Sequence, residues 1–182
     1  MQYFVTGATG FIGKRLVKKL LERKGTVVYF LLRKESADKV AELRSYWGVS
    51  AARAVPVFGD LKSKKLGVAA EDVKKLKGQI DHFHHLAAVY DLSADTESQV
   101  AVNVEGTRNT VEFARAIDAG HFHHVSSIAA AGLYEGVFRE DMFDEAEHLD
   151  MPYFQTKHEA EGIVRKESTL PWRIYRPGIV VG

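Results

Sequence analysis

The sequence has no cysteine, which excludes disulfide bonds, thiolate metal sites and cysteine nucleophiles. Its apolar runs all fall short of the roughly 18 residues that a membrane-spanning helix needs. No basic-then-apolar signal segment precedes the first of them. An excess of one charge is also missing, because 25 Lys and Arg nearly balance 24 Asp and Glu. Composition therefore gives no electrostatic case for a nucleic-acid or anionic-membrane partner, and a cytoplasmic protein is the default expectation.

Repeats and low-complexity linkers are absent as well. Of the 182 residues, 46% are hydrophobic and 27% are charged, which is ordinary for a globular protein. This length is about that of one domain and suffices for a substantial core. We expect a single domain over residues 1–182.

Short apolar runs alternate with amphipathic segments along the chain. We expect strands at residues 2–6, 26–32, 53–58, 80–88, 121–126 and 172–175. We expect helices at residues 11–23, 36–47, 95–118 and 152–168, and a short one within the charged stretch 62–78. This alternation predicts an α/β protein with a doubly wound parallel sheet, the Rossmann fold, with strand order 3-2-1-4-5-6.

Two of these segments also carry a burial pattern. Residues 26–32 form a continuous apolar, β-branched run, typical of a strand buried on both faces of a parallel sheet. The first expected helix has a single apolar stripe made of Phe11, Ile12, Leu16, Val17, Leu20 and Leu21.

Three glycines join the first expected strand to the first expected helix. Gly7 allows a tight turn, Gly10 lets backbone N–H groups approach a pyrophosphate, and Gly13 lets the helix pack closely. The unpaired N–H groups at the start of the helix then face the phosphates. The alternative is an ordinary glycine-rich loop. On the first interpretation, the cofactor contacts are Gly7, Thr9, Gly10, Phe11, Ile12 and Gly13.

The residue about 20 positions after these glycines normally meets the adenosine ribose. An acid there suits a 2′-hydroxyl, whereas an arginine suits a 2′-phosphate; this chain has Arg33, followed by Lys34. We therefore expect NADP(H) to be preferred over NAD(H), the alternative being a solvated basic turn. Asp60, at the tip of the third strand, can accept a hydrogen bond from the adenine amino group or simply cap its own turn.

A tyrosine and a lysine stand four residues apart in the last expected helix. Tyr153 and Lys157 share one helix face, and a nearby ammonium lowers the pKa of a phenol from about 10, which favours proton transfer. As an isolated pattern, the pair would be a surface contact. Ser126 and Ser127 end the fifth strand, where ligands lie in such sheets, and a serine there can hydrogen-bond a substrate carbonyl. Spacing alone does not choose between the two serines.

Together these motifs resemble the extended branch of the short-chain dehydrogenase/reductase superfamily, over essentially the whole chain. The glycines have its Gly-x-x-Gly-x-x-Gly spacing, and residues 103–107 resemble its Asn-Val-x-Gly-Thr motif. Placing Gly132 on the usual glycine of the serine segment selects Ser127 as the catalytic serine. The resemblance implies that the catalytic residues are Ser127, Tyr153, Lys157 and Asn103, the last through a proton relay.

The same resemblance implies further cofactor contacts. Residues 85–88 are similar to the segment that closes over the cofactor, with Leu86 and Ala87. Residues 176–178 are similar to the loop near the nicotinamide, with Pro177. Tyr153 and Lys157 also belong to the cofactor site, because the lysine holds the ribose.

A finer resemblance is to fatty acyl-CoA reductases and the thioester reductase domains of carboxylic acid reductases and peptide synthetases. It rests on residues 31–33, on Gly59-Asp60-Leu61 followed by residues 66–68, and on the run from Ala87 to Tyr90. It implies NADPH-dependent reduction of an acyl thioester, on CoA or a carrier protein, with Asp60 and Leu61 at the cofactor. The alternatives are a sugar-nucleotide epimerase or dehydratase, which more often has an acid near position 33, and a non-catalytic NADP(H)-sensing regulator.

Three other features complete the expectations. Extended-branch members continue past this loop into a substrate-binding region, so we expect further domains of a longer chain beyond Gly182. The motif His-Phe-His-His occurs at 82–85 and at 121–124; we expect hydrogen-bonded imidazoles and no metal site, which needs three or four convergent ligands. The acidic run 135–150 is expected to be a solvated loop or a flap over the substrate.

Overall fold

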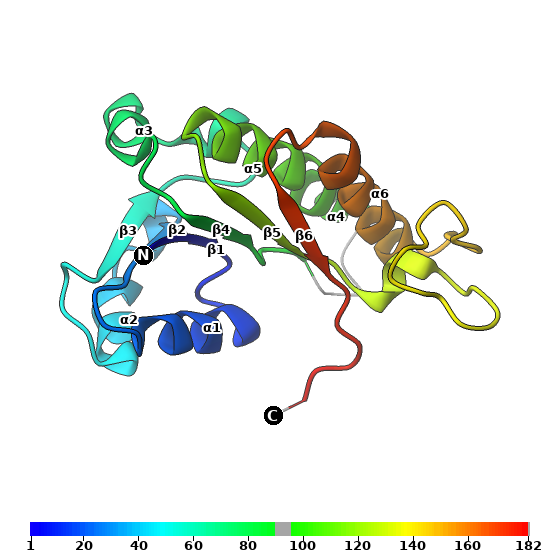
Figure 1. Cartoon of the computed structure of the whole chain (residues 1–182), viewed down its shortest axis with the longest axis horizontal. Coiled ribbons are helices and arrows are strands. Elements are labelled where there is room, and N and C mark those ends of the chain that lie inside the picture. Colours follow the sequence, from blue (N-terminus) through cyan, green and yellow to red (C-terminus); the bar gives the residue numbers. More distant parts are fainter. Residues whose placement is uncertain (90–95, 182) are drawn as a thin grey trace.

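The computed structural model describes residues 1–89 and 96–181. Six strands in these ranges form one sheet in which neighbouring strands are parallel, in the order β3-β2-β1-β4-β5-β6 (Figure 1). The predicted fold class and strand order are thus confirmed. The strands are β1 (Gln2–Thr6), β2 (Val27–Leu32), β3 (Ala54–Phe58), β4 (His82–His85), β5 (His121–Val125) and β6 (Trp172–Tyr175).

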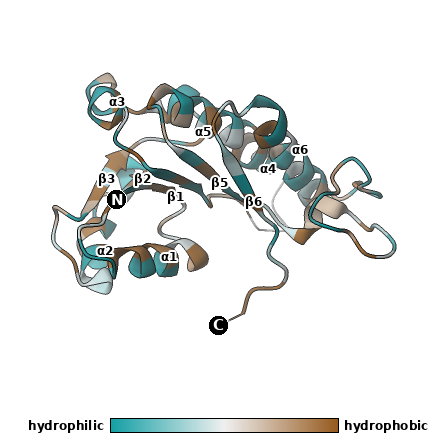
Figure 2. Ribbon diagram, viewed as in Figure 1, coloured by the Kyte–Doolittle hydropathy of each residue, from teal (hydrophilic) through white to brown (hydrophobic). Residues whose placement is uncertain are grey.

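Helices cover both faces of this sheet. In Figure 1, α1 and α2 lie on one face, and α5 and α6 lie on the other. Each of these helices carries both hydrophobic and hydrophilic residues (Figure 2). No helix within the described ranges is both long and apolar enough to cross a membrane. The helices are α1 (Phe11–Leu21), α2 (Lys39–Trp47), α3 (Ala70–Leu76), α4 (Thr96–Gln99), α5 (Glu105–Ala116) and α6 (Pro152–Glu167), with short turns η1 (Lys34–Ser36), η2 (Lys64–Gly67), η3 (Val100–Val104) and η4 (Ile128–Ala131).

Two hydrophobic clusters fill the space between the sheet and its helices. Beneath α5 and α6, Phe4, Phe83 and Phe122 come from three adjacent strands, with ring centroids 4.7 and 5.4 Å apart. On the other face, Phe30 of β2 meets Trp47 of α2 edge to face at 5.3 Å. Because helices cover both faces of the sheet, a ligand can reach the strands only at the sheet's edges. In parallel α/β sheets, ligands bind at the edge formed by the carboxyl ends of the strands.

The burial predicted for β2 is right for one face only. Its residues Val28, Phe30 and Leu32 are buried beneath α1 and α2, whereas Tyr29 and Leu31 are partly buried against the other cluster.

The apolar stripe predicted for α1 is wrong at its start. Phe11 and Ile12 are 45% and 38% exposed, and the core side of the helix begins at Gly13 and Val17. The reason is position: the first turn of α1 follows the glycine turn at the rim of the sheet, where the core ends.

The long helix predicted over residues 95–118 is present from Thr96 to Ala116, but it is not a regular α-helix. Residue 95 lies outside the described ranges, and α4, a π-helical turn η3 and α5 follow one another without a break. A π-helical turn shifts the side-chain positions of an α-helix locally and is frequent at functional sites. Here it contains Asn103, whose side chain is bonded to two other segments.

The strand predicted at 80–88 is shorter, because β4 ends at His85. The chain then turns toward β1: the N–H of Leu86 donates to Thr6 O at 3.3 Å, and the N–H of Ala87 donates to Thr6 Oγ1 at 3.3 Å. This departure from the sheet brings Ala87 against the glycine turn.

Since all six strands are parallel, their carboxyl ends share one edge of the sheet. One of the predicted site residues follows each strand within two positions. Gly7 follows β1, Arg33 follows β2, and Asp60 follows β3. Ala87, Ser127 and Pro177 follow β4, β5 and β6. We call this edge the rim.

Candidate functional site

The glycine turn is held by backbone contacts that exclude side chains. Gly7 has a φ of +75°, and a Cβ there would lie 2.7 Å from Ala87 N. A Cβ on Gly13 would overlap Gly7 O. Gly7 therefore supplies the predicted tight turn, and Gly13 lets α1 approach that turn directly.

Gly10 is under a weaker constraint than these two glycines. Its φ is −76°, and a Cβ there would have one neighbour within 4 Å among the described residues, Gly7 O at 3.3 Å. It is the N-cap of α1 and makes no side-chain capping bond, so the first N–H groups of the helix face the rim. Thr9, Phe11 and Ile12 surround this opening as exposed residues. A space open to backbone N–H groups suits a phosphate.

A second part of the rim forms a hollow of about 170 Å³ beyond β2 and β3. Arg33 and Asp60 both line it, so the two residues predicted at the adenosine end share one concavity. Asp60 Oδ1 accepts a hydrogen bond of 2.8 Å from the N–H of Lys62, which is the turn-capping role considered as its alternative. The full lining is Arg33, Lys34, Glu35, Phe58, Gly59, Asp60, Ser63 and Gly67.

A left-handed turn that the sequence did not reveal supports this hollow. Lys65 and Leu66 have φ values of +48° and +59°, which non-glycine residues adopt only at an energetic cost. Leu66 O accepts a 2.8 Å hydrogen bond from Asp60 N. Leu61, predicted at the cofactor, packs its side chain against the core, and its carbonyl accepts from Asn109 Nδ2 at 2.8 Å.

His85 lies under the rim in a buried network that sequence reasoning also missed. Its Nδ1 lies 2.7 Å from Thr6 Oγ1, and its Nε2 lies 3.0 Å from Thr107 Oγ1. Burial, reinforced by the nearby Lys157 ammonium, lowers the pKa of His85 to about 3. The imidazole is therefore neutral and links β1, β4 and α5 directly beneath Gly7. Leu86 follows it and packs partly against the core.

Asn103 ties three segments together. Its Oδ1 accepts from Val89 N at 2.8 Å, and its Nδ2 donates to Val89 O at 3.2 Å. The same amide donates to Thr156 Oγ1 on α6 at 3.3 Å. Tyr90, part of the run that suggested the finer resemblance, lies outside the described residues. Asn103 thus fixes the chain after β4 against α6.

Lys157 is buried despite its charge. It is 3% exposed, and its Nζ donates to Val125 O, the last carbonyl of β5, at 3.1 Å. Burial lowers the pKa of Lys157 to about 8, although the carboxylate of Glu161 acts in the opposite direction. Tyr153, one turn earlier on α6, is 8% exposed. The pair is therefore not the surface contact considered as its alternative.

The two serines after β5 have different surroundings. Ser126 is buried, and its hydroxyl faces the carboxylate of Glu161. Ser127 is half-buried at the rim, where its Oγ accepts from Ala129 N at 3.1 Å and starts η4. Pro177 O accepts from the N–H of Ile128 at 3.1 Å, which joins the loop after β6 to the serine segment. Position at the rim favours Ser127 for contact with a substrate.

The histidines on the other face of β4 and β5 form a ladder. His82 Nδ1 lies 3.0 Å from His123 Nε2, and His123 Nδ1 lies 3.0 Å from Tyr175 Oη. His84 stacks on His123 at 4.4 Å, and burial lowers their pKa values to about 3 and about 4. In the described part of the chain, no three His, Asp or Glu side chains are grouped to hold a metal ion.

A larger hollow of about 550 Å³ lies beside α6, away from the glycine turn. None of the four residues predicted to be catalytic lines it. Its lining is Leu149, Asp150, Gln155, His158 and Glu159.

Comparison with known proteins gives a family match over nearly the whole chain. The model of a family of NAD-binding domains, described as male sterility protein, matches residues 5–182. A component of the linear gramicidin synthase of Brevibacillus parabrevis is 31% identical over 193 residues, covering 98% of this chain and 4% of that protein. A putative fatty acyl-CoA reductase of Drosophila melanogaster is 25% identical over 221 residues, covering 98% of this chain and 41% of that protein.

Two solved structures resemble the chain in fold and sequence. One is the terminal R domain from the myxalamid PKS-NRPS biosynthetic pathway, with a TM-score of 0.84 and 31% identity, covering 100% of this chain and 49% of that chain. The other is UDP-glucuronic acid 4-epimerase from Bacillus cereus in complex with NAD, with a TM-score of 0.77 and 26% identity, covering 100% and 58%. The chain spans less than two thirds of each of these proteins.

The family match covers all six strands apart from the first residues of β1. It includes the glycine turn after β1, where close backbone contacts exclude side chains, as in dinucleotide-binding turns. This chain belongs to the male sterility protein family, within the extended short-chain dehydrogenases/reductases, which bind a nicotinamide dinucleotide.

Proposed function

We propose that the protein is an NADPH-dependent reductase of an acyl thioester, carried by CoA or by a carrier protein, or of a related carbonyl. The observation that carries the proposal is the place of Lys157. Its ammonium is buried at the carboxyl end of β5, where it donates to the carbonyl of Val125, two residues before Ser127 in the sequence. On α6, Lys157 lies one helical turn after Tyr153. Burying the charge of a lysine costs free energy. A role in proton transfer, beside a tyrosine at the edge of the sheet where ligands bind, accounts for keeping a lysine in such a place.

The rim has the shape that a dinucleotide needs. The contacts at Gly7 and Gly13 leave no room for side chains, and α1 begins directly after Gly10, which puts no side chain in front of its first N–H groups. The hollow lined by Arg33 and Asp60 is suited to the adenosine end, with the guanidinium of Arg33 as the partner of a 2′-phosphate. Ala87, after β4, borders the glycine turn, because a Cβ on Gly7 would lie 2.7 Å from its backbone nitrogen. Pro177, after β6, is bonded to the serine segment through the N–H of Ile128. Bound NADPH would supply the hydride.

Each predicted catalytic residue has a distinct role in this proposal. Because Ser127 Oγ already accepts from Ala129 N, its own hydrogen is available to a substrate carbonyl oxygen. Tyr153 donates a proton to that oxygen as the carbonyl carbon receives the hydride. The resulting hemithioacetal then releases the thiol and leaves the aldehyde. Lys157 lowers the pKa of the tyrosine and holds the ribose, and Asn103 supports a water relay.

A second candidate is a sugar-nucleotide epimerase, favoured by the 26% identity to UDP-glucuronic acid 4-epimerase. Tyr153 and Lys157 would serve both reactions, so these residues do not discriminate between them. Arg33 does: an epimerase that keeps NAD bound has use for an acid at this position, whereas Arg33 suits a 2′-phosphate. The reductase names among the relatives, fatty acyl-CoA reductase and the terminal R domain, support the first proposal.

The test is consumption of NADPH by the protein in its full length, in the presence of a long-chain acyl-CoA, measured through the fluorescence of NADPH. We expect turnover in the wild type, and a loss of roughly 10²- to 10⁴-fold in Tyr153→Phe with an unchanged affinity for NADPH. Lys157→Met should weaken both turnover and NADPH binding, because it loses a ribose contact as well. Tyr46→Phe, a change on the exposed side of α2, is the matched control.

The possible outcomes separate the hypotheses. Wild-type turnover in Tyr153→Phe would remove the tyrosine from the role of proton donor. Interconversion of UDP-sugars with NAD, without net consumption of cofactor, would favour the epimerase. Tight NADPH binding without turnover of thioester or sugar would favour a cofactor-sensing regulator.

A further inference from the structure

Residues 133–147 leave the rim and return to it as a closed loop, which we call the flap. Its neck is a backbone pair: Leu133 N donates to Glu147 O at 2.8 Å, and Glu147 N donates to Ala131 O at 3.2 Å. Gly132 has a φ of +66°, and a Cβ there would overlap Glu147 O. Because this neck follows η4, the flap starts only a few residues after Ser127.

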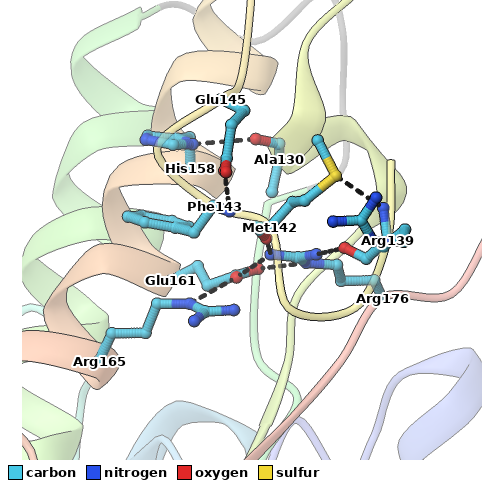
Figure 3. Close-up of polar contacts among 9 residues, drawn as sticks. All are labelled: Ala130, Arg139, Met142, Phe143, Glu145, His158, Glu161, Arg165 and Arg176. Carbon is cyan, nitrogen blue, oxygen red and sulfur yellow. Dashed lines mark hydrogen bonds and ion pairs between the residues drawn. The ribbon is translucent and has the colours of Figure 1, made fainter. Parts of the chain in front are cut away.

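Arg176, in the loop after β6, holds the middle of the flap (Figure 3). Its guanidinium donates to Met142 O at 2.7 Å and to Arg139 O at 3.2 Å. The same group binds both carboxylate oxygens of Glu161 on α6, at 2.6 and 3.1 Å. It also lies over the ring of Phe138, 5.0 Å from its centroid. One side chain thus joins the flap, α6 and the loop after β6.

Glu161 keeps its charge although it is fully buried. Burial by itself raises the pKa of Glu161, but hydrogen bonds from Arg176 and Arg165 outweigh this, so the pKa lies below its ordinary value. Arg165 Nε donates to Glu161 Oε1 at 2.9 Å and covers the ring of Phe143. Removing one cation from this cluster therefore leaves the other facing the carboxylate.

The flap also stacks on α6. The ring of Phe143 lies parallel to His158, with centroids 4.2 Å apart, and His158 Nδ1 lies 2.9 Å from Ala130 O in η4 (Figure 3). The ring stacking is a contact between side chains, whereas the hydrogen bonds from Arg176 hold two backbone carbonyls in the middle of the flap.

We propose that Arg176 is a positioning residue that fixes the flap against α6 and holds the flap, Ser127 and Lys157 in one arrangement. Two links carry its position into the site. Pro177, the next residue, accepts a hydrogen bond from the N–H that follows Ser127. Glu161, its ion-pair partner, lies one turn beyond Lys157 on α6. The effect on catalysis rests on the proposed reductase function, whereas the effect on the flap does not.

The first experiment measures cleavage of the flap by a protease that cuts after glutamate. Glu140 lies between the two carbonyls that Arg176 holds, and its neighbours are exposed. In Arg176→Met we expect cleavage after Glu140 to be roughly ten- to a hundredfold faster, because two charge-assisted hydrogen bonds are lost. Arg139→Ala is the matched control, since it removes an exposed side chain and keeps the carbonyl. Cleavage of Arg176→Met at the wild-type rate, with unchanged circular dichroism, would overturn the proposal.

Two further measurements keep the proposal testable if that variant does not fold. Arg176→Lys keeps the charge beside Glu161 but cannot bind two carboxylate oxygens and two carbonyls together, so cleavage after Glu140 should again accelerate. In the unaltered chain, the Nε–H of Arg176 should exchange with solvent at least roughly tenfold more slowly than that of exposed Arg139. Equal exchange of the two signals would contradict the proposal without any substitution.

The effect of Arg176 on catalysis is tested by comparing kcat, KM for acyl-CoA and the affinity for NADPH between the variant and the wild type. In Arg176→Lys we expect kcat with acyl-CoA to fall by roughly tenfold, while the affinity for NADPH stays within about twofold of the wild type. If the wild type lacks reductase activity and the flap still loosens in the variant, the proposed function fails and the positioning of the flap stands. If activity is present and the flap does not loosen, the positioning proposal fails alone.

Discussion

The two halves of the rim are built by different physical means. After β1, β2 and β3, the rim is shaped by backbone: Gly7 and Gly13 allow close approach, and the charged side chains Arg33, Lys34 and Glu35 are exposed. After β4, β5 and β6 it is shaped by buried polar side chains. His85, Asn103, Lys157 and Glu161 are all at most 3% exposed, and each has a hydrogen-bond partner from another segment.

This difference separates the two tasks of the site. Backbone groups can bind the phosphates that NADH and NADPH share. On the proposed function, the choice between the two cofactors therefore depends on exposed side chains such as Arg33, which can change with little effect on the stability of the fold. A buried polar network is costly to alter, because an unsatisfied partner stays behind in a medium of low dielectric constant. The first half should therefore respond to substitutions by steric fit, and the second by charge.

The largest expected effect tests the steric half. Gly13→Ala should destabilise the chain by about 1–3 kcal/mol, because the new methyl group would overlap Gly7 O, even though alanine has the better helix propensity by about 1 kcal/mol. Chemical denaturation followed by circular dichroism measures the change. We also expect NADPH binding to be lost, since relief of the overlap moves the turn itself.

Gly10→Ala is the matched comparison. Its φ of −76° suits alanine, and the nearest atom would be Gly7 O at 3.3 Å, so stability should stay within about 1 kcal/mol of the wild type. NADPH affinity should nevertheless fall by roughly tenfold or more, because the methyl group occupies the phosphate approach. Equal destabilisation by both substitutions would show that the glycines serve packing alone.

The next effect in size concerns cofactor choice. Arg33 lies in the same hollow as Asp60, and a charge-assisted hydrogen bond to a 2′-phosphate corresponds to a preference of roughly ten- to a hundredfold for NADPH over NADH. Arg33→Asp should reverse this preference, because the acid accepts from a 2′-hydroxyl and repels a phosphate. Calorimetric titration with both cofactors at fixed salt measures it.

Lys34→Asp makes the same change of charge one residue later. Lys34 begins η1 and lines the same hollow, but its ammonium lacks the planar fork by which Arg33 can bind two phosphate oxygens, so its loss should cost only a few-fold. If both substitutions changed the preference equally, net charge and not the position of Arg33 would set it. Equal affinity of the wild type for NADPH and NADH would exclude Arg33 as a phosphate partner.

The contrast between the halves also explains what could be predicted from sequence. The strand order, the six rim loops and the glycine turn follow from local patterns, because each depends on periodicity or on a residue type within a few positions. Arg33 and Asp60 were found for the same reason, and the structure adds that they line one hollow.

The remaining features depend on contacts between distant segments. Nothing in the sequence near His85 indicates that Thr6 and Thr107 bind its two nitrogens, 79 and 22 residues away. The periodicity of residues 95–118 predicts a regular α-helix throughout. The structure instead has a π-helical turn that contains Asn103, whose side chain is hydrogen-bonded to Val89 and Thr156. Tertiary hydrogen bonding outweighs local pattern in both cases.

The last expected effect is a pH dependence that belongs to the buried half. The pKa of Lys157 is lowered from 10.5 to about 8 by burial, with Glu161 opposing the shift. Between these two values the unfolded chain binds a proton that the folded chain has released. The free energy of unfolding should therefore rise with pH in this window, by at most about 1.4 kcal/mol per pH unit for one proton. This contribution is complete above 10.5 and is lost as the pH falls toward 8.

Other groups titrate in the same range, so the informative quantity is the difference between the wild type and Lys157→Met, whose side chain fills a similar volume without a charge. The titratable groups that interact electrostatically with Lys157 are Glu161 on α6, His85 on β4 and His124 on β5, and Tyr153 lies one turn earlier on α6. The two histidines are neutral above pH 8, because burial and the ammonium itself lower their pKa values. Denaturation at intervals between pH 7.5 and about 10.5 should give a steeper rise for the wild type than for the variant. Parallel curves would mean that Lys157 keeps its ordinary pKa. In that case burying the ammonium of Lys157 would cost no free energy of folding, and the proposed difference between the two halves of the rim would not hold for this charge.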